Sequence, residues 1–281
     1  MNIDIKKYPI FRSWDIITNG YLSIKNRLLI LLSIKPKQFK TNLTLNQSID
    51  FSKLKSIDDD YRKGQPWGDF HPDKLLEWYD HNGINLTERG LEFSVTTNKK
   101  DVVVKDKAAT IPFGVGLVVS KRSYIYGVFE WNVTLPSGIG LWPAVWLGGK
   151  KTWPPEIDVI EAYSDNNGDW GKRLNTNVHL GDKNENHYQV GGMRHGSYIK
   201  TTELKLTLEW TEKFIKIYYN DYLVRKITNK YDLSWFKDVE QVIILNTALN
   251  PEWVNANTNY NDLSKSPFIV KDFKYYTTST I

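Results

Sequence analysis

The chain has no cysteine among its 281 residues, which excludes disulfide bonds and metal sites built on thiolates. It also lacks a long apolar run: its most apolar stretch, residues 28–34, is much shorter than the ~20 residues that a bilayer span requires. This stretch lies deep in the chain and precedes Lys35-Pro36-Lys37 instead of small residues, so it does not have the pattern of a signal peptide. We expect no membrane span, and we interpret residues 28–34 as a strand or an anchoring segment.

Neither sign of charge dominates strongly. The chain has 37 basic and 32 acidic side chains, a net charge of +5, and its lysines are scattered along the sequence. No nucleic-acid-binding motif is present, so we expect a solvated surface and no nucleic acid partner. A positive field of this size would also attract a sulfated polysaccharide.

Helical periodicity is scarce, and the clearest short helix is expected near residues 231–236. Strand signals recur instead, separated by turns rich in Gly, Pro and Asn. The expected strands are 90–95, 115–119, 126–133, 204–210, 214–219 and 241–245. The chain is long enough for one large all-β domain, which we place at residues 46–281. Residues 1–45 are an N-terminal segment of unknown role, and docking to a larger assembly is one hypothesis for it.

Residues 156–161 carry the strongest functional signal, because three carboxylates are threaded through an otherwise apolar strand, Glu156-Ile157-Asp158-Val159-Ile160-Glu161. Side chains alternate between the faces of a strand, so Glu156 and Asp158 share one face and Glu161 is out of phase. A β-bulge around Val159-Ile160 would bring Glu161 onto the same face. Such bulges are common beside active sites, where they re-aim a side chain.

Three carboxylates on one face suit the hydrolysis of a glycosidic bond. In retaining glycosidases one carboxylate is the nucleophile and one carboxylic acid is the proton donor. Asp158 would raise the pKa of the donor, because like charges so close together cannot all ionise. The alternatives are an exposed acidic strand face and a non-catalytic, lectin-like glycan-binding module. The apolar residues of the stretch favour burial, which is costly for a carboxylate without a function.

Tryptophan is frequent near this strand, and the chain contains 11 Trp in total. In the extended segment 140–147, Trp142 and Trp146 fall on one face. Indole rings stack against the C–H faces of sugars, although a tryptophan pair in the core is the structural alternative. The predicted substrate-binding tryptophans are Trp142, Trp146 and Trp153, with Trp131 and Trp253 as weaker candidates.

Polar residues follow the acidic strand. The extended segment 175–179 places Asn177 and His179 on one face, where we expect them to line a cleft; a purely structural hydrogen-bonding role is the alternative. The segment 182–196 is long and polar, and the forked guanidinium of Arg194 would suit a sulfate unless it is an ordinary surface arginine. The spacing of the five histidines does not indicate a metal site.

The order and spacing of these motifs resemble glycoside hydrolase family 16. The matching stretches are 126–130, 135–136, 140–147 and 153–161, followed by the weaker 177–179, 208–221, 243–248 and 268–276. The resemblance covers about residues 46 to 281. It implies a β-jelly-roll sandwich of two antiparallel sheets with a concave substrate cleft.

The resemblance also implies an endo-acting, retaining glycoside hydrolase. By position, Glu156 would be the nucleophile, Asp158 its electrostatic partner and Glu161 the general acid/base. Two residues separate Asp158 from Glu161, as in family members that act on β-1,3-glucan, agar or carrageenan, whereas lichenases and xyloglucan-active members have one. We expect β-1,3-glucan of the laminarin type as substrate, and a red-algal galactan (agar, porphyran or carrageenan) as the alternative.

The resemblance implies no required cofactor. A structural calcium ion occurs in many relatives, but the sequence does not place its ligands. Because polysaccharide-degrading enzymes usually work outside the cell, we expect an extracellular or virion-associated protein, although the chain shows no recognisable signal peptide.

Overall fold

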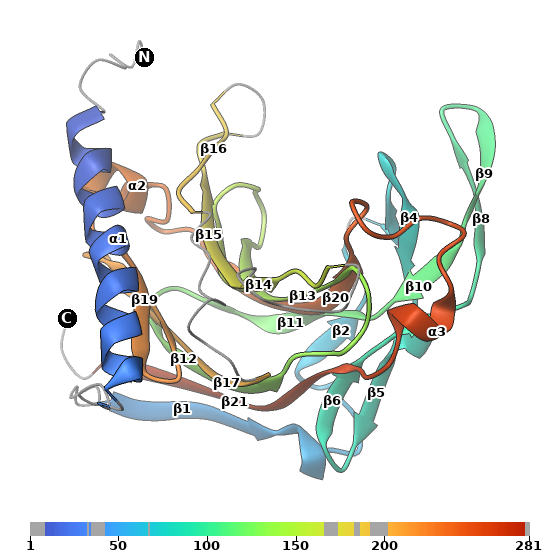
Figure 1. Ribbon diagram of the computed structural model, residues 1–281, viewed down its shortest axis with the longest axis horizontal. Coiled ribbons are helices and arrows are strands. Elements are labelled where there is room, and N and C mark those ends of the chain that lie inside the picture. Colours follow the sequence, from blue (N-terminus) through green and yellow to red (C-terminus); the bar gives the residue numbers. More distant parts are fainter. Residues whose placement is uncertain are drawn as a thin grey trace.

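Two curved antiparallel sheets stack face to face in the computed structural model (Figure 1). The structure describes residues 9–32, 34, 43–66, 68–165, 174–182, 186–191 and 202–278. Within these ranges most elements are strands, and the fold is the β-jelly-roll sandwich that the sequence predicted.

The first layer is an eight-stranded sheet, counted over the described residues. In spatial order it contains β19 (Tyr222–Ile227), β18 (Ile215–Tyr219), β17 (Glu203–Trp210), β12 (Gly127–Thr134), β21 (Phe268–Thr278), β6 (Gly90–Phe93) and β5 (Ile84–Thr87), and β1 (Leu43–Asp50) pairs with β21. We call it the outer sheet. Because β1 begins at Leu43 and pairs with the last strand, the sandwich starts just before the boundary that we expected at residue 46.

The second layer is a seven-stranded sheet, again counted over the part of the chain that is described. Its strands are β16 (Tyr188–Gln189), β15 (Leu174–Leu180), β14 (Glu156–Ala162), β13 (Leu141–Gly149), β20 (Gln241–Leu249), β11 (Leu117–Tyr124) and β2 (Tyr61–Lys63). We call it the inner sheet. The acidic strand β14 lies between β13 and β15, away from both edges of this sheet.

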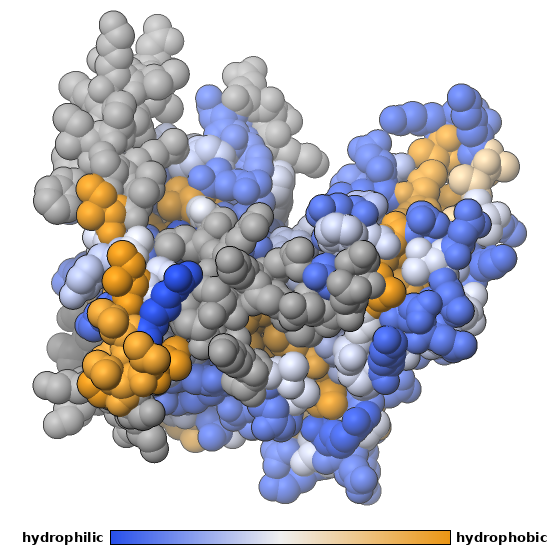
Figure 2. Space-filling model, viewed as in Figure 1, coloured by the Kyte–Doolittle hydropathy of each residue, from blue (hydrophilic) through white to orange (hydrophobic). Residues whose placement is uncertain are grey.

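Smaller elements rise beside the inner sheet. A small sheet consists of β3 (Phe70–His71), β4 (Lys74–Tyr79), β10 (Phe113–Val115) and β7 (Val95–Thr96), and β8 (Lys100–Val104) forms a hairpin with β9 (Lys107–Ile111). The short helices are α2 (Lys230–Ser234) and α3 (Tyr260–Leu263), with single 3₁₀ turns η2 (Phe51–Lys53) and η3 (His81–Gly83). Figure 2 shows a hollow between the side of β15 and β16 and the side of β8 and β9.

The main core lies between the two sheets. Val145, Ile157 and Val159 of the inner sheet are fully buried in the same cluster as Phe129 and Leu208 of the outer sheet. Alternation along each strand sends these side chains inward and leaves their sequence neighbours on the other face. On β14 this sorting turns the isoleucines and valine toward the core and the carboxylates toward the hollow.

The N-terminal segment contains the principal error of the sequence analysis. Of the two alternatives for residues 28–34, a strand or an anchoring segment, the strand was wrong, because residues 28–31 are the end of a long helix, α1 (Pro9–Leu31). This helix packs against β19 at the edge of the outer sheet (Figure 1). A short apolar run fits a buried strand and a helix equally well, so its composition alone was not decisive. No helix in the described ranges combines the length and apolarity needed to cross a membrane.

Candidate active site

A β-bulge on β14 brings the three carboxylates together. Asp158 pairs with Asn177 of β15 and Glu161 pairs with Asn175, so three steps along β14 correspond to two steps along β15. The register toward β13 shifts at the same place, between Val145 and Trp146. The bulge predicted around Val159-Ile160 is therefore present. It returns Glu161 to the face that carries Glu156 and Asp158.

A tyrosine from the other sheet supports this bulge. The Tyr219 hydroxyl lies 2.9 Å from the carbonyl oxygen of Val159 and 3.1 Å from that of Asn175. Tyr219 is fully buried and belongs to β18 of the outer sheet. A bulge leaves backbone groups outside the regular ladder, and a buried carbonyl without a partner is costly. Tyr219 therefore connects the packing of the core to the position of Glu161.

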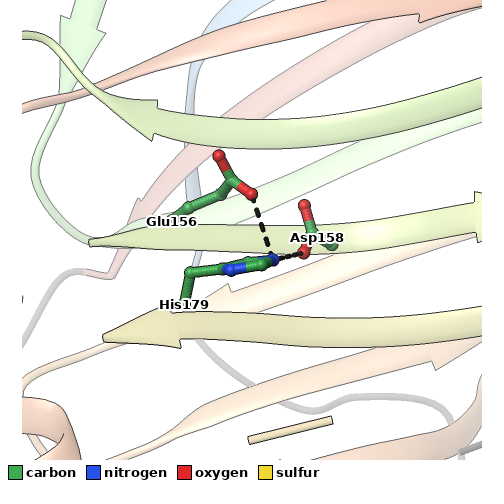
Figure 3. Close-up of side chains that lie close together, drawn as sticks. All are labelled: Glu156, Asp158 and His179. Carbon is green, nitrogen blue, oxygen red and sulfur yellow. Dashed lines mark ion pairs between the residues drawn. The ribbon is translucent and has the colours of Figure 1, made fainter. Parts of the chain in front are cut away.

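Glu156 is held by an indole and an imidazole. The Trp153 Nε1–H group donates to Glu156 Oε2 at 2.8 Å. His179 Nε2 lies 3.4 Å from Glu156 Oε1 and 3.3 Å from Asp158 Oδ2, as Figure 3 shows. Glu156 is 9% exposed and Asp158 is 3% exposed. These two carboxyl groups are thus almost dry and share one cationic partner when His179 is protonated.

Glu161 has a different set of donors. The Tyr163 hydroxyl donates to Glu161 Oε1 at 2.9 Å, and the Trp142 indole donates to the same oxygen at 3.2 Å. The Trp142 and Tyr163 rings are in contact, with centroids 4.8 Å apart. Because both donors form hydrogen bonds to Oε1, a proton on this carboxyl group would be carried by Oε2.

Burial is the main reason why all three carboxyl groups resist ionisation. It raises the pKa of Glu156 well above its usual value, and the charge of Asp158 adds to the rise. Burial also raises the pKa of Asp158, and the charge of Glu161 adds to this rise. The pKa of Glu161 is raised by burial too, and the hydrogen bond from Tyr163 opposes this rise. At least one proton is thus retained in the cluster at pH values where free carboxyl groups are ionised.

The predicted polar wall on β15 is in place. His179 pairs with Glu156 across the β14–β15 ladder, and Asn177 pairs with Asp158. Asn177 Nδ2 lies 3.1 Å from His179 Nε2 and donates to Gln189 at 3.2 Å. Both residues therefore contact the carboxylates or their partners.

The predicted tryptophans divide into two groups. Trp142 and Trp153 donate to Glu161 and Glu156, and Trp146 donates through Nε1 to Asn246 of β20 at 2.8 Å, so these three lie at the carboxylate cluster or on its face of the sheet. The prediction that Trp131 binds substrate was wrong. Trp131 is 0% exposed and packs at 5.3 Å from Phe273, because it points from β12 into the core.

Two further candidates, Arg194 and Trp253, stay predictions. Arg194 lies outside the described residues. Trp253 lies in the turn after β20, half-buried, where its backbone N–H donates to Asn250.

Three further side chains complete the site: sequence reasoning missed Tyr163 and Lys74, and it included His187 only as part of the long polar segment 182–196. Tyr163 stands two residues after Glu161, and strand alternation alone places it on the same face. His187 Nε2 lies 2.9 Å from His179 Nδ1, and its ring centroid lies 4.9 Å from that of Trp153. Lys74 Nζ, from β4, lies 5.5 Å from the Trp142 ring centroid. His187 and Lys74 approach from other segments, so only the fold reveals them.

One group of side chains in the described ranges has the geometry to bind a metal ion. The donor atoms of Glu156, Asp158 and His179 all lie within 4.8 Å of one another. These are the same side chains that form the carboxylate cluster, so a metal ion there would compete with hydrolysis that relies on free carboxyl groups.

The chain is similar to characterised glycan hydrolases. The profile of glycosyl hydrolases family 16 matches residues 79–261. Endo-1,3-1,4-beta-glycanase EglC of Rhizobium meliloti (strain 1021) is 28% identical over 169 residues, covering 56% of this chain and 35% of that protein. Beta-glucanase of Rhodothermus marinus is 30% identical over 152 residues, covering 47% of this chain and 51% of that protein. The chain thus spans about half or less of the length of these relatives.

Among solved structures, the laminarinase catalytic domain of Thermotoga maritima MSB8 matches with a TM-score of 0.63. The match covers 85% of this chain and 100% of that domain, at 18% identity. At this identity the likeness shows a common fold.

Proposed function

This chain belongs to glycoside hydrolase family 16, and on this basis we propose that it is an endo-acting, retaining hydrolase of a β-linked polysaccharide, with β-1,3-glucan of the laminarin type as its substrate. The observation that carries the proposal is the bulge that joins Glu161 to Glu156 and Asp158 on one buried face. Two relatives whose names specify 1,3 linkages, one of them a glucan endo-1,3-beta-glucosidase, support the choice of substrate class.

In this proposal Glu161 is the general acid. Its pKa is raised by burial, so it retains its proton to a higher pH than a free carboxyl group does. The donors Tyr163 and Trp142 occupy Oε1, which leaves the Oε2 proton directed to the glycosidic oxygen. Loss of such a group costs on the order of 10² to 10⁴ in rate.

Glu156 is the nucleophile. Its anion has two partners outside the carboxylate cluster, the Trp153 indole and the His179 imidazole. Asp158 is the least exposed of the three carboxyl groups, at 3%, and shares a strand face with Glu156, so in its protonated form it can donate to Glu156 and orient it. The three carboxyl groups of this buried site thus have different hydrogen-bonding partners, and this difference gives each of them a different role.

The reaction follows from these assignments. A Glu156 oxygen attacks the anomeric carbon while the glycosidic C–O bond breaks, and the leaving oxygen takes the proton from Glu161. The ionised Glu161 then accepts a proton from water, whose oxygen attacks the same carbon and releases Glu156. Two inversions give net retention. No step needs a metal or another cofactor, and we expect EDTA-treated protein to keep its hydrolytic rate.

Trp142, Trp146 and Trp153 would stack on sugar rings at the floor of the hollow, with Asn177 and His179 binding hydroxyl groups. An extracellular or virion-associated site of action is part of the proposal, because polymeric glycans of this kind lie outside cells.

One observation favours a second candidate, a sulfated galactan. Lys74 is exposed, and its ammonium group lies beside Trp142 and near Glu161, where it would meet an anionic substituent of the bound sugar. The first experiment therefore tests both classes: wild-type protein is incubated with laminarin, mixed-linkage glucan, agarose, porphyran and carrageenans, and products are read as reducing ends and oligosaccharide masses.

The matched pair of variants is Glu156→Gln and Glu209→Gln. Glu209 is also buried, at 5% exposure, but it belongs to β17 of the outer sheet. We expect oligosaccharides from one substrate with wild type and Glu209→Gln and none with Glu156→Gln. Full activity of Glu156→Gln would refute the assignment, and binding without product release by wild type would support the lectin alternative.

A further inference from the structure

Helix α1 has an inner face that closes the free edge of the outer sheet. Asn19, Leu22 and Asn26 are buried, with exposures of 2%, 7% and 3%. The Asn19 amide donates to the carbonyl of Lys226 at 3.1 Å and accepts from the N–H of the same residue at 2.9 Å. Asn26 donates to the carbonyl of Leu223 at 2.8 Å. These amides take the place of a neighbouring strand beside β19, and an uncovered edge would invite strand pairing.

The opposite face of α1 is apolar and exposed. Figure 2 shows this apolar strip along the helix. Single exposed apolar residues are ordinary, but a contiguous row of them marks an interaction surface. The row, which we call the seam, consists of Ile17, Tyr21, Ile24, Leu28 and Leu31, each 54% to 78% exposed.

The spacing of the seam is that of a coiled coil. Its residues follow one another at intervals of four, three, four and three, the 3.5-residue repeat of a and d positions. In that frame Asn19 and Asn26 take f positions, directly opposite the seam, which agrees with their contacts to β19. From Ile17 to Leu28 the exposed apolar side chains follow a narrow a/d seam, which suits a second helix, whereas a helix that lies in a bilayer surface has a broader apolar face along its length. Leu32 and Ile34, 63% and 47% exposed, widen the apolar surface only at the C-terminal end.

We propose that the seam is a homodimer interface, in which α1 of a second copy packs antiparallel against it. In the register that packs Tyr21 against Ile24 of the second copy, Ile17 packs against Leu28 of the second copy. Each large aromatic side chain then faces a smaller branched one, which allows the two rows to interdigitate.

The charges beside the seam select this register. Lys25 and Arg27 flank the seam at e and g positions, and both are exposed. In the proposed register Lys25 lies opposite Thr18 of the second copy and Arg27 lies opposite Gly20. A shift by one heptad toward the C-terminus would instead place Lys25 against Lys25 and Arg27 against Arg27. A parallel pair would put all four cations at one level, whereas the antiparallel pair separates the two sets by about 10 Å along the axis.

The size of the seam sets the expected strength of the dimer. Burying one aliphatic side chain contributes about 1.5 to 3 kcal/mol, which at about 25 cal/mol per Å² corresponds to roughly 60 to 120 Å² of apolar surface removed from water. In this register Ile17, Tyr21, Ile24 and Leu28 of each copy face one another, and together these side chains bury roughly 500 to 1,000 Å², the size of a weak interface. We expect a dimer that forms in the micromolar range and dissociates on dilution.

Sedimentation velocity of the full chain between about 1 and 100 µM tests the dimer. The disrupting variant is Ile24→Glu, in the middle of the seam. Its matched control is Val103→Glu, which also places a carboxylate at an exposed apolar position, 72% exposed, on the β8–β9 hairpin. We expect wild type and Val103→Glu to dimerise and Ile24→Glu to remain monomeric with an unchanged unfolding transition. A wild type that stays monomeric throughout overturns the proposal.

Cysteine cross-linking tests the direction of the helices, because the natural chain has no cysteine. We expect a disulfide between the Ile17→Cys variant and a mass-tagged Leu28→Cys variant when the two are mixed. In the antiparallel pair two copies of position 17 lie about 16 Å apart, beyond the reach of a disulfide. Disulfides within the Ile17→Cys variant alone would overturn the antiparallel arrangement. Binding of monomeric wild type to phosphatidylglycerol vesicles, lost in Ile24→Glu, would assign the seam to membranes instead.

Discussion

Replacing Tyr163 by Phe should move the alkaline limit of activity to higher pH. The Tyr163 hydroxyl donates to Glu161 Oε1 at 2.9 Å and thereby stabilises the ionised form of that carboxyl group. Without the donor, Glu161 ionises less readily and its pKa rises further. If Glu161 is the general acid, kcat/KM falls as pH rises through this pKa, so the falling limb shifts upward.

The size of the shift follows from the hydrogen bond. A hydrogen bond to a charged group contributes about 1.5 to 3 kcal/mol net, and one pKa unit corresponds to about 1.4 kcal/mol. The expected shift is therefore about 1 to 2 units. It should lie near the lower value, because the Trp142 indole still donates to the same oxygen at 3.2 Å.

The assay is the pH profile of kcat/KM on the substrate identified above. The control is Tyr218→Phe, which also removes a hydroxyl that donates to a buried carboxylate, Glu209 Oε2 at 3.3 Å, but on the outer sheet. Stability gives a second readout: a group with a raised folded-state pKa stabilises the protein below its unfolded pKa and loses this contribution as pH rises through the folded value. Tyr163→Phe should therefore match wild type in acid and be less stable at neutral pH.

If the alkaline limb of the kcat/KM profile stays at the same pH in Tyr163→Phe, or shifts to lower pH, then Glu161 is not a general acid whose pKa is lowered by Tyr163. A shift of equal size in Tyr218→Phe would show that the limb reports a general property of the fold.

Three further predictions concern the core and the carboxylate cluster. Asp158→Asn should lose hydrolysis but raise the free energy of unfolding at pH 7 by on the order of 1 kcal/mol, since Asn mimics the protonated form that burial favours. Urea titrations would contradict this if the variant were no more stable than wild type at pH 7, or if its added stability were the same at pH 4. Trp131→Ala should cost about 3 to 5 kcal/mol of stability in urea titrations without changing KM, and an increased KM in folded protein would return Trp131 to the substrate site. Tyr219→Phe frees the Val159 carbonyl at the bulge and should lower kcat more than it changes KM, whereas kinetics equal to those of Tyr218→Phe would show that the bulge does not depend on Tyr219.

The local pattern of the acidic strand predicted much of the site correctly. Alternation placed Glu156 and Asp158 on one face, and their mismatch with Glu161 required a bulge, which the register of β14 against β15 contains. The same alternation explains why Trp142 and His179 face the carboxylates. These relations depend on the pleat of a single strand and its neighbours, which residue spacing records directly.

Errors arose where one residue type serves two environments. Trp131 was predicted to bind sugar, but strand β12 is buried on the face that carries it, and an indole fits a core as well as a sugar. A strand at residues 28–34 was wrong because an apolar composition fits a helix equally well, and the four-three spacing that continues back to Ile17 is the helical signal in this segment. In both cases the face that is buried depends on what packs against it.

By itself, the sequence determined the class of fold, the family and the carboxylates on one bulged strand, because periodicity and short motifs are properties of neighbouring residues. Tertiary structure alone decided which groups complete the site and the surface. Tyr219 reaches the bulge from the other sheet, Lys74 approaches from β4, the segment before β16 brings His187 to His179, and β19 decides which face of α1 remains exposed. Most of these contacts join residues far apart in the chain, and only the packing of the sheets, the loops and the helix against one another brings them together.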